Sequence, residues 1–182
     1  MSERQQIGAA IRRIAWGYIF IHVHFNLITM DILADWLGYC MIFWALPVLA
    51  KRVQSVMLLR PLGLILIFWN VFDWFMDIGG ISANTYGLEL VATVLDLYFH
   101  FQLLTDLAGI AKQYGHPAGR KLLHLRTART VLAASIHIFL YWLAKEMAVV
   151  LGIAIVQLIL AVWLCRVLFR FGKELMEEET DA

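Results

Sequence analysis

The chain has 182 residues, of which 62% are hydrophobic and 16% are charged, and its net charge is +1. Soluble domains have about 45–50% apolar and about 25% charged residues, so this composition excludes an ordinary soluble domain and indicates a single-domain membrane protein. The small net charge argues against a nucleic-acid partner, because there is no basic excess to neutralise phosphates. We expect no cleavable signal peptide, and the two cysteines form no motif.

Six apolar segments are each close to the length of about 20 residues that a helix needs to cross the hydrocarbon core. They predict an all-α fold, a polytopic membrane bundle of six transmembrane helices. In chain order these helices are expected at about residues 7–29, 33–50, 57–76, 88–111, 127–144 and 147–171. Only Lys145 and Glu146 separate the last two segments, so one long fused helix is the alternative there.

Basic residues alternate with acidic or neutral residues in the connections between these segments. Short cytoplasmic loops carry an excess of Lys and Arg, so the alternation predicts both termini in the cytoplasm of a multi-pass protein of a cell (plasma or inner) membrane. The fourth connection is expected to lie along the cytoplasmic interface. Its basic residues, which mark the ends of the helices beside it, are Lys112, Arg120, Lys121, Arg126 and Arg129.

The fourth predicted helix carries several ionisable residues within an apolar segment. Glu89, Thr93, Asp96 and His100 follow one another at intervals of four, three and four, which places them on one face of a helix. An ionisable group inside a bilayer costs several kcal/mol unless it is paired or hydrated. The stripe therefore indicates either a polar site or polar contacts between helices.

Polar residues of three other predicted helices lie at a similar depth. Measured at 1.5 Å per residue from the basic helix ends, they fall near the middle or in the non-cytoplasmic half of a core about 30 Å thick. Asp73, Asp96 and His100 are predicted to form an anionic centre. The residues predicted to complete this ligand-binding site are His22, Asn26, Asn70 and His137.

Three functions fit this convergence. The leading prediction is a transporter or transporter subunit that binds a small polar or cationic solute, or protons, in a cavity near the midplane. The second is a membrane enzyme in which Asp96, His100 and His137 ligate a metal, or in which two of His22, His100 and His137 ligate haem. The third is a structural or accessory protein in which these groups only join helices.

No motif identifies a cofactor or a reaction. The sequence has no HExxH, GxSxG, CxxC or P-loop pattern, which favours the non-enzymatic functions. The expected partners are the lipid bilayer, a small-molecule or ionic ligand, and a membrane-protein partner or a second copy of the chain.

An internal similarity connects the first and fourth predicted helices. HFNLIT at residues 24–29 resembles HFQLLT at residues 100–105, and these helices run in opposite directions in the predicted topology. A 3+3 inverted repeat, as found in many transporters, would leave such a pair. A chance match between apolar sequences is the alternative.

The segment MDILADWLGYCMIFWALP, residues 30–47, resembles part of a known group of proteins. It is similar to small, uncharacterised membrane proteins of Firmicutes-type bacteria, in which an acidic, Leu-rich turn precedes Gly-Tyr and an apolar run. Ala34 stands where those proteins often have Pro. The resemblance implies a bacterial inner membrane but no activity or site residues. The matching positions are Asp31, Leu33, Asp35, Gly38 and Tyr39.

Overall fold

A computed structural model describes residues 2–22, 26–27, 30–31, 35–79, 86–143 and 147–177. This part of the chain is all-α apart from one pair of two-residue strands, β1 (Asn26–Leu27) and β2 (Met30–Asp31), and a short 3-10 helix, η1 (Gln54–Leu58). Each of the six predicted segments contains a helix. The helices are α1 (Glu3–His22), α2 (Asp35–Leu49), α3 (Leu59–Ile78), α4 (Tyr86–Gln113), α5 (Ala118–Leu143) and α6 (Met147–Glu177).

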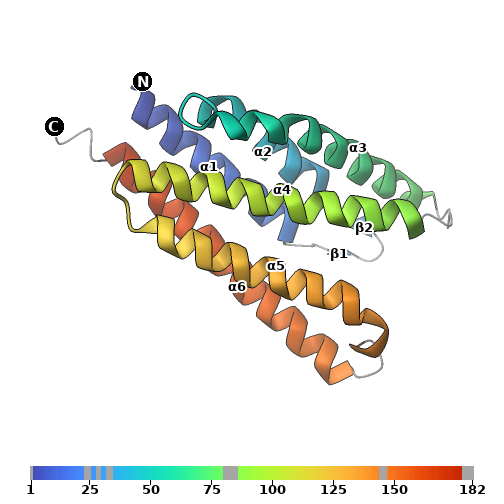
Figure 1. The fold of residues 1–182 in the computed structure, drawn as a ribbon. Coiled ribbons are helices and arrows are strands. Elements are labelled where there is room, and N and C mark those ends of the chain that lie inside the picture. Colours follow the sequence, from blue (N-terminus) through green and yellow to red (C-terminus); the bar gives the residue numbers. More distant parts are fainter. Residues whose placement is uncertain are drawn as a thin grey trace.

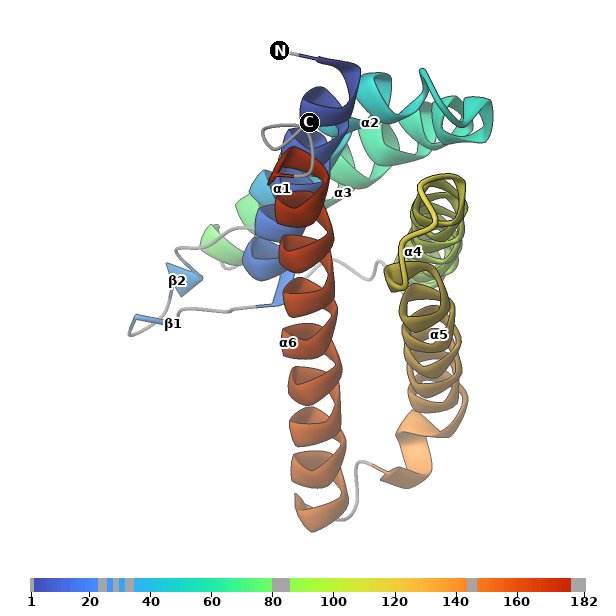
Figure 2. The same cartoon turned by 90° about the vertical axis from the view of Figure 1, so that its left-hand side faces the viewer.

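The helices form a ring in which each one packs on the next and α6 packs on α1. Successive helices run in opposite directions, so the two ends of the chain lie at the same end of the bundle (Figure 1). The α5–α6 pair diverges from the other helices away from that end, as Figures 1 and 2 show. The ring therefore has a tightly packed end near the termini and a more open end opposite.

Helix α1 fits between α2 and α6 because its buried residues recur with helical spacing. Ile7, Ile11, Ile14 and Tyr18 are separated by four, three and four residues, and each is fully buried. Such a stripe buries one continuous face, and the packing of α1 on α6 closes the ring that the α3–α4 contact also joins.

Two pairs of glycines bring α1 close to its neighbours. A Cβ on Gly17 would lie 2.7 Å from the carbonyl oxygen of Gly38 on α2, and a Cβ on Gly8 would lie 2.7 Å from that of Gly172 on α6. Any larger residue would meet the opposite backbone. Small residues at helix crossings are typical of membrane helix packing.

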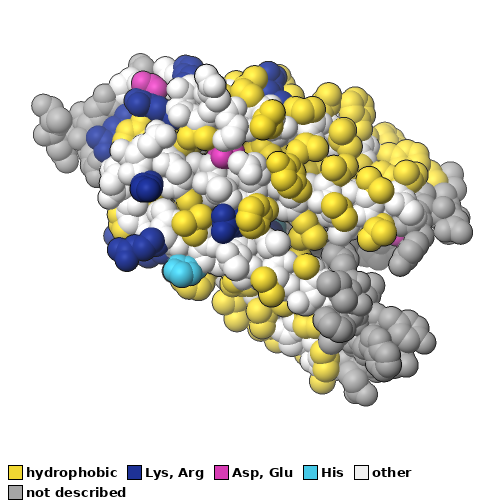
Figure 3. All heavy atoms as spheres, in the orientation of Figure 1, with side chains coloured by type: hydrophobic (Ala, Val, Ile, Leu, Met, Phe, Trp, Pro, Cys, Tyr) yellow, Lys and Arg dark blue, Asp and Glu magenta, His cyan; other side chains and the backbone are white. Residues whose placement is uncertain are grey.

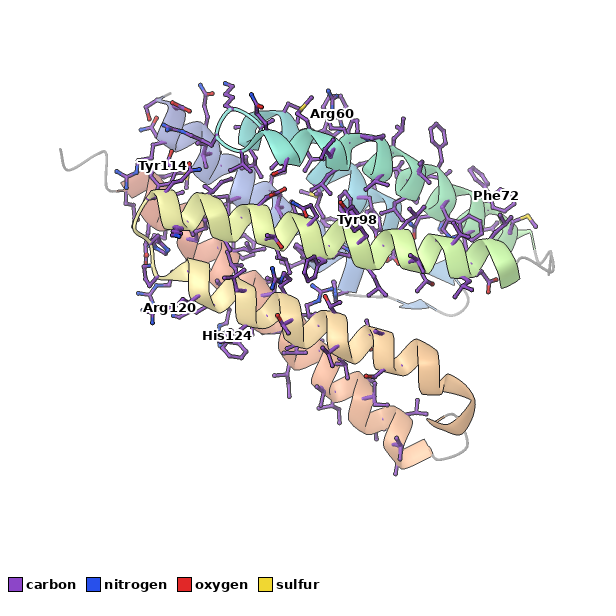
Figure 4. All side chains as sticks on the ribbon, viewed as in Figure 1. Arg60, Phe72, Tyr98, Tyr114, Arg120 and His124 are labelled. Carbon is purple, nitrogen blue, oxygen red and sulfur yellow. The ribbon has the colours of Figure 1, made fainter. Side chains whose placement is uncertain are left out.

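Within the described residues, three helical segments are long and apolar enough to cross a membrane: Gln54–Met76, Gly87–Gln113 and Ala148–Glu177. Large hydrophobic side chains cover the outer faces of these helices; Phe68 and Phe75, for example, are 68% and 61% exposed. In Figure 3 such side chains extend over α3 and α4, and Phe72, labelled in Figure 4, points outward. Contiguous apolar surface of this kind marks contact with lipid or with another protein, which supports a membrane protein.

The predicted boundary of the first helix was wrong. Helix α1 ends at His22, and Asn26 pairs with Asp31 in the antiparallel strands β1 and β2. Asn26 therefore does not share a helical face with His22. The sequence after His22 is rich in β-branched and Asx residues, which have low helix propensity, although its apolar character suggested a continuous span.

This ending of α1 also bears on the proposed internal repeat. HFQLLT lies within α4, whereas Asn26 and Leu27, the described residues of HFNLIT, lie in β1. The residues of the two segments that the structure describes therefore differ in secondary structure. Their likeness gives an inverted repeat no structural support.

The fifth helix begins nine residues before its predicted start at Thr127. The segment from Ala118 is amphipathic: Leu122 and Leu125 are buried, while Arg120 and Lys121 are exposed. Arg120 and His124 point outward from the first turns of α5 in Figure 4. The segment expected to lie along the interface is thus the beginning of α5, because the apolar run alone marked only the later part of the helix.

Candidate functional site

Four side chains from α1, α2 and α4 form a hydrogen-bonded cluster inside the bundle. The Tyr18 hydroxyl lies 3.0 Å from His100 Nδ1, and His100 Nε2 lies 3.1 Å from Asp96 Oδ1. The Tyr39 hydroxyl donates to the same Asp96 oxygen and lies 3.4 Å from His100 Nε2. Tyr18, Tyr39 and His100 are all buried. The cluster therefore joins three helices through polar contacts.

The donors and acceptors of this cluster define one consistent arrangement. An ionised Asp96 only accepts, so His100 Nε2–H donates to it and His100 Nδ1 accepts from the Tyr18 hydroxyl. If His100 takes up a second proton at Nδ1, the Tyr18 hydroxyl has to rotate and accept instead. In either arrangement the Tyr18 hydroxyl and His100 Nδ1 remain hydrogen-bonded.

Asp96 also faces a cavity of about 430 Å³ between α2, α3 and α4. Its side chain is 37% exposed, so it contacts the buried cluster on one side and the cavity on the other. No Lys or Arg is among the described residues that line this cavity. The polar residues that line it are Asp35, Tyr39, Trp69, Asn70, Asp73, Glu89, Thr93 and Asp96.

This acidic cavity lies at the end of the bundle opposite the chain termini. Asp35 begins α2, Asp73 lies in the last turns of α3, and Glu89 lies in the first turn of α4. Because successive helices are antiparallel, these three positions meet at one end of the bundle. Antiparallel packing thus brings together carboxylates that are far apart in the sequence.

The structure brings together three of the predicted site residues directly. Asn70, Asp73 and Asp96 line the acidic cavity. The Asn70 amide also donates to the carbonyl oxygen of Leu66 at 2.8 Å. His100 contacts Asp96 on the side away from the cavity and does not line the cavity. The predicted anionic centre is therefore a wall of carboxylates with a buried histidine behind it.

The other predicted site residues are placed differently. His22 lines a second cavity, described below. Asn26 lies in β1, and its side chain is outside the described part of the structure. His137 lies in α5, and its side chain is also outside the described part.

The second cavity has a volume of about 340 Å³ and lies between α1, α5 and α6. Arg129 Nη2 donates to His22 Nε2 at 2.7 Å, and His22 Nδ1 lies 2.9 Å from the carbonyl oxygen of Tyr18. Because Arg only donates and a carbonyl only accepts, His22 Nδ1 carries the proton and the ring is neutral. The Arg129 guanidinium lies 5.2 Å from the centre of the Tyr18 ring.

Sequence reasoning placed Arg129 at the cytoplasmic end of a helix and so missed it. It lies eleven residues after Ala118, which is about 16 Å along α5. The signal that could have located the true start of α5 is His116, whose Nδ1 accepts from the backbone N–H of Ala118 at 3.1 Å as a helix cap does. A start at Ala118 moves Arg129 into the interior.

The predicted metal ligands were Asp96, His100 and His137, and the side chain of His137 lies outside the described part of the structure. Among the residues with described side chains, no group of three or more His, Cys, Asp and Glu is arranged to hold a metal ion. His22 and His100 each have both ring nitrogens engaged by protein atoms. A metal or haem at either one would have to displace a hydrogen-bond partner.

Comparison with protein-family models, with curated proteins and with solved structures found no match to this chain. The features that bear on function are therefore the two cavities and the hydrogen-bonded cluster beside them.

Proposed function

We propose that this chain is a multi-pass membrane transporter, or a transporter subunit, that binds a small cationic solute in the acidic cavity between α2, α3 and α4. The observation that carries the proposal is the convergence of Asp35, Asp73, Glu89 and Asp96 on one cavity. Like charges that share a low-dielectric site repel one another, and a cation in their midst relieves that repulsion.

The size of the cavity favours a small organic solute. Its volume of about 430 Å³ falls in the range of roughly 300–1,000 Å³ that is typical of small-molecule pockets. Trp69 and Tyr39 contribute aromatic rings to the wall. Aromatic rings attract ammonium groups through their negative faces, so a protonated amine or quaternary ammonium compound suits the site.

Protons are the natural coupling ion for such a site. Asp96 faces the cavity and contacts His100, which in turn contacts Tyr18. A cation that enters the cavity competes for the same negative charge that holds a proton in the cluster. This competition is the arrangement that proton-coupled transport requires.

The proposed orientation places both termini in the cytoplasm of a bacterial inner membrane, with six crossings. Basic side chains gather at the end of the bundle that carries the termini (Figure 3). Arg4 and Arg52 lie over the Tyr114 ring there, at 5.2 and 5.6 Å. Basic residues favour the cytoplasmic side, so the acidic cavity at the opposite end opens away from the cytoplasm.

A thermal-shift screen of the purified chain in lipid nanodiscs against amines and quaternary ammonium compounds tests the proposal. A ligand present at 100 times its dissociation constant stabilises the folded state by about 2.7 kcal/mol. We expect Asp73→Asn and Asp96→Asn to abolish the stabilisation. Glu177→Gln is the matched control, because Glu177 pairs with Lys173 at the far end of the bundle. A hit that survives both cavity substitutions would refute the cation site.

One observation supports an accessory protein as the second candidate. Tyr18, Tyr39 and His100 are buried and satisfied by one another and by Asp96, as expected of side chains that only join helices. The two functions differ at Asp73, which lies outside that cluster. An accessory protein would show no ligand-dependent stabilisation that Asp73→Asn removes.

A further inference from the structure

We infer that the cavity between α1, α5 and α6 is a second binding site, which takes the carboxylate of a small ligand with an apolar body. The site does not depend on the cation site proposed above. Its polar residues are Arg129, His22 and Gln157. The rest of its wall is apolar and comes from Ile21, Leu132, Ala133, Ala154, Leu158, Leu160 and Ala161.

Arg129 carries a positive charge that pairs directly with no described acidic residue, although it interacts electrostatically with Asp96 at longer range. Its Nη2 donates to neutral His22, while its Nη1 is buried without a hydrogen-bond partner among the described residues. None of the ion pairs in the described part of the chain involves Arg129. A guanidinium without a direct anionic partner is unfavourable within a membrane bundle, and a carboxylate in the adjacent cavity would supply that partner.

His22 holds Arg129 in place without neutralising it. Its Nδ1–H is committed to the carbonyl oxygen of Tyr18, so its Nε2 presents only a lone pair to Arg129. The Tyr18 ring supports the guanidinium from one side. Arg129 is thus held by neutral groups, and its Nη1 has no hydrogen-bond partner among the described residues.

The chemistry of the wall selects a monocarboxylate over other anions. The planar guanidinium matches the two oxygens of a carboxylate, and Gln157 on α6 offers one neutral amide beside it. Arg129 is the single basic residue of the described wall, so a phosphate dianion would keep an uncompensated charge. A volume of about 340 Å³ with mainly aliphatic walls suits a short acyl chain or one ring.

Tyr18 lies between the two cavities. Its ring contacts Arg129 and its hydroxyl contacts His100, which holds Asp96 at the wall of the acidic cavity. A carboxylate at Arg129 and a cation or proton near Asp96 would therefore be separated by one side chain and its hydrogen-bond partners.

Hexanoate binding to the full-length chain in phosphatidylcholine nanodiscs, measured by titration calorimetry, tests this site. We expect saturable binding of hexanoate and at least tenfold weaker binding of hexanamide, which has the same apolar body without the charge. Arg129→Gln should weaken hexanoate binding at least tenfold. The matched control is Arg126→Gln, because Arg126 donates to Thr105 and stacks on Phe101 outside the cavity; it should change binding less than twofold.

Two further variants keep the inference falsifiable if Arg129→Gln does not fold. Ala133→Phe fills the cavity and should abolish hexanoate binding, while Asp73→Asn in the acidic cavity should leave it unchanged. The absence of saturable hexanoate binding to the wild type, or equal binding by Ala133→Phe, would overturn the inference. Competition by palmitate would identify a membrane fatty acid as the source of the carboxylate, whereas its failure to compete would identify a water-soluble acid.

Discussion

His100 has both ring nitrogens engaged, one by Tyr18 of α1 and the other by Asp96 of its own helix. The interval of four residues between Asp96 and His100 predicts that they share a helical face, and the structure confirms their contact. The partner on α1 could not be predicted, because spacing within one helix does not say which residue of another helix meets it. Arg129 was missed as a site residue because its depth depends on where α5 begins.

Tyr18→Phe tests how much one hydroxyl of the cluster contributes to the stability of the fold. The substitution leaves His100 Nδ1 buried without its donor, and a buried unsatisfied group costs about 1–3 kcal/mol. We expect the free energy of unfolding in detergent to fall by that amount. Tyr98→Phe is the control, since Tyr98 is 50% exposed on the outer face of α4 and is expected to change stability by less than about 0.5 kcal/mol (Figure 4).

Equal stability of the Tyr18→Phe and Tyr98→Phe proteins would show that the Tyr18–His100 hydrogen bond contributes nothing to folding. The cluster would then have to be explained by function alone. If only Tyr18→Phe lowers the free energy of unfolding, the cluster stabilises the fold. The ligand-binding experiments then decide between a transporter and an accessory protein.

At the scale of elements, the helices were predictable where the apolar run and the helix coincide. Helix α6 begins at the predicted residue, Met147, and α2 and α3 begin within two residues of their predicted starts. The predicted helix boundaries were wrong where the apolar run and the helix do not coincide. Asn26–Leu27 and Met30–Asp31, the described residues between α1 and α2, form strands in an apolar segment, and the segment from Ala118 is helical while carrying basic residues. Hydropathy indicates whether a segment lies in lipid or in water, whereas helix propensity and capping residues indicate whether its backbone is helical.

The close crossing of α1 and α2 makes a specific prediction about glycine. In Gly17→Ala the new Cβ would lie 2.7 Å from the Gly38 carbonyl oxygen, so one backbone has to move. We expect a loss of about 1–3 kcal/mol in unfolding free energy, which is typical of overpacking. Gly109→Ala is the control, because nothing lies within 4 Å of its Cβ, and Ala is favoured over Gly within a helix by about 1 kcal/mol.

The two glycine variants should therefore shift the thermal midpoint in opposite directions. A Gly17→Ala protein as stable as the Gly109→Ala protein would mean that α1 and α2 do not cross as closely as the structure shows.

At the scale of the whole molecule, charge patterning and helix direction agree that both ends of the chain lie on one side of the bundle. The alternation of basic connections predicts both termini on one side, and the antiparallel ring places both described ends of the chain at one end of the bundle (Figure 1). The convergence of carboxylates at the opposite end could be anticipated only for Asp73 and Asp96, whose depths follow from helix rise. Asp35 and Glu89 were not among the predicted site residues.

This orientation can be tested with single cysteines placed at the two ends of the bundle. In a protein with Cys40 and Cys165 replaced by Ser, Gly79→Cys follows α3 at the end that carries the acidic cavity, and Gly115→Cys lies between α4 and α5 at the basic end. Because short cytoplasmic connections are enriched in Lys and Arg, a membrane-impermeant maleimide should label Gly79→Cys in intact cells. It should reach Gly115→Cys only after the membrane is permeabilised. Labelling of both from outside would contradict a membrane crossing by α4, which separates the two positions, and the reverse pattern would place the acidic cavity on the cytoplasmic side.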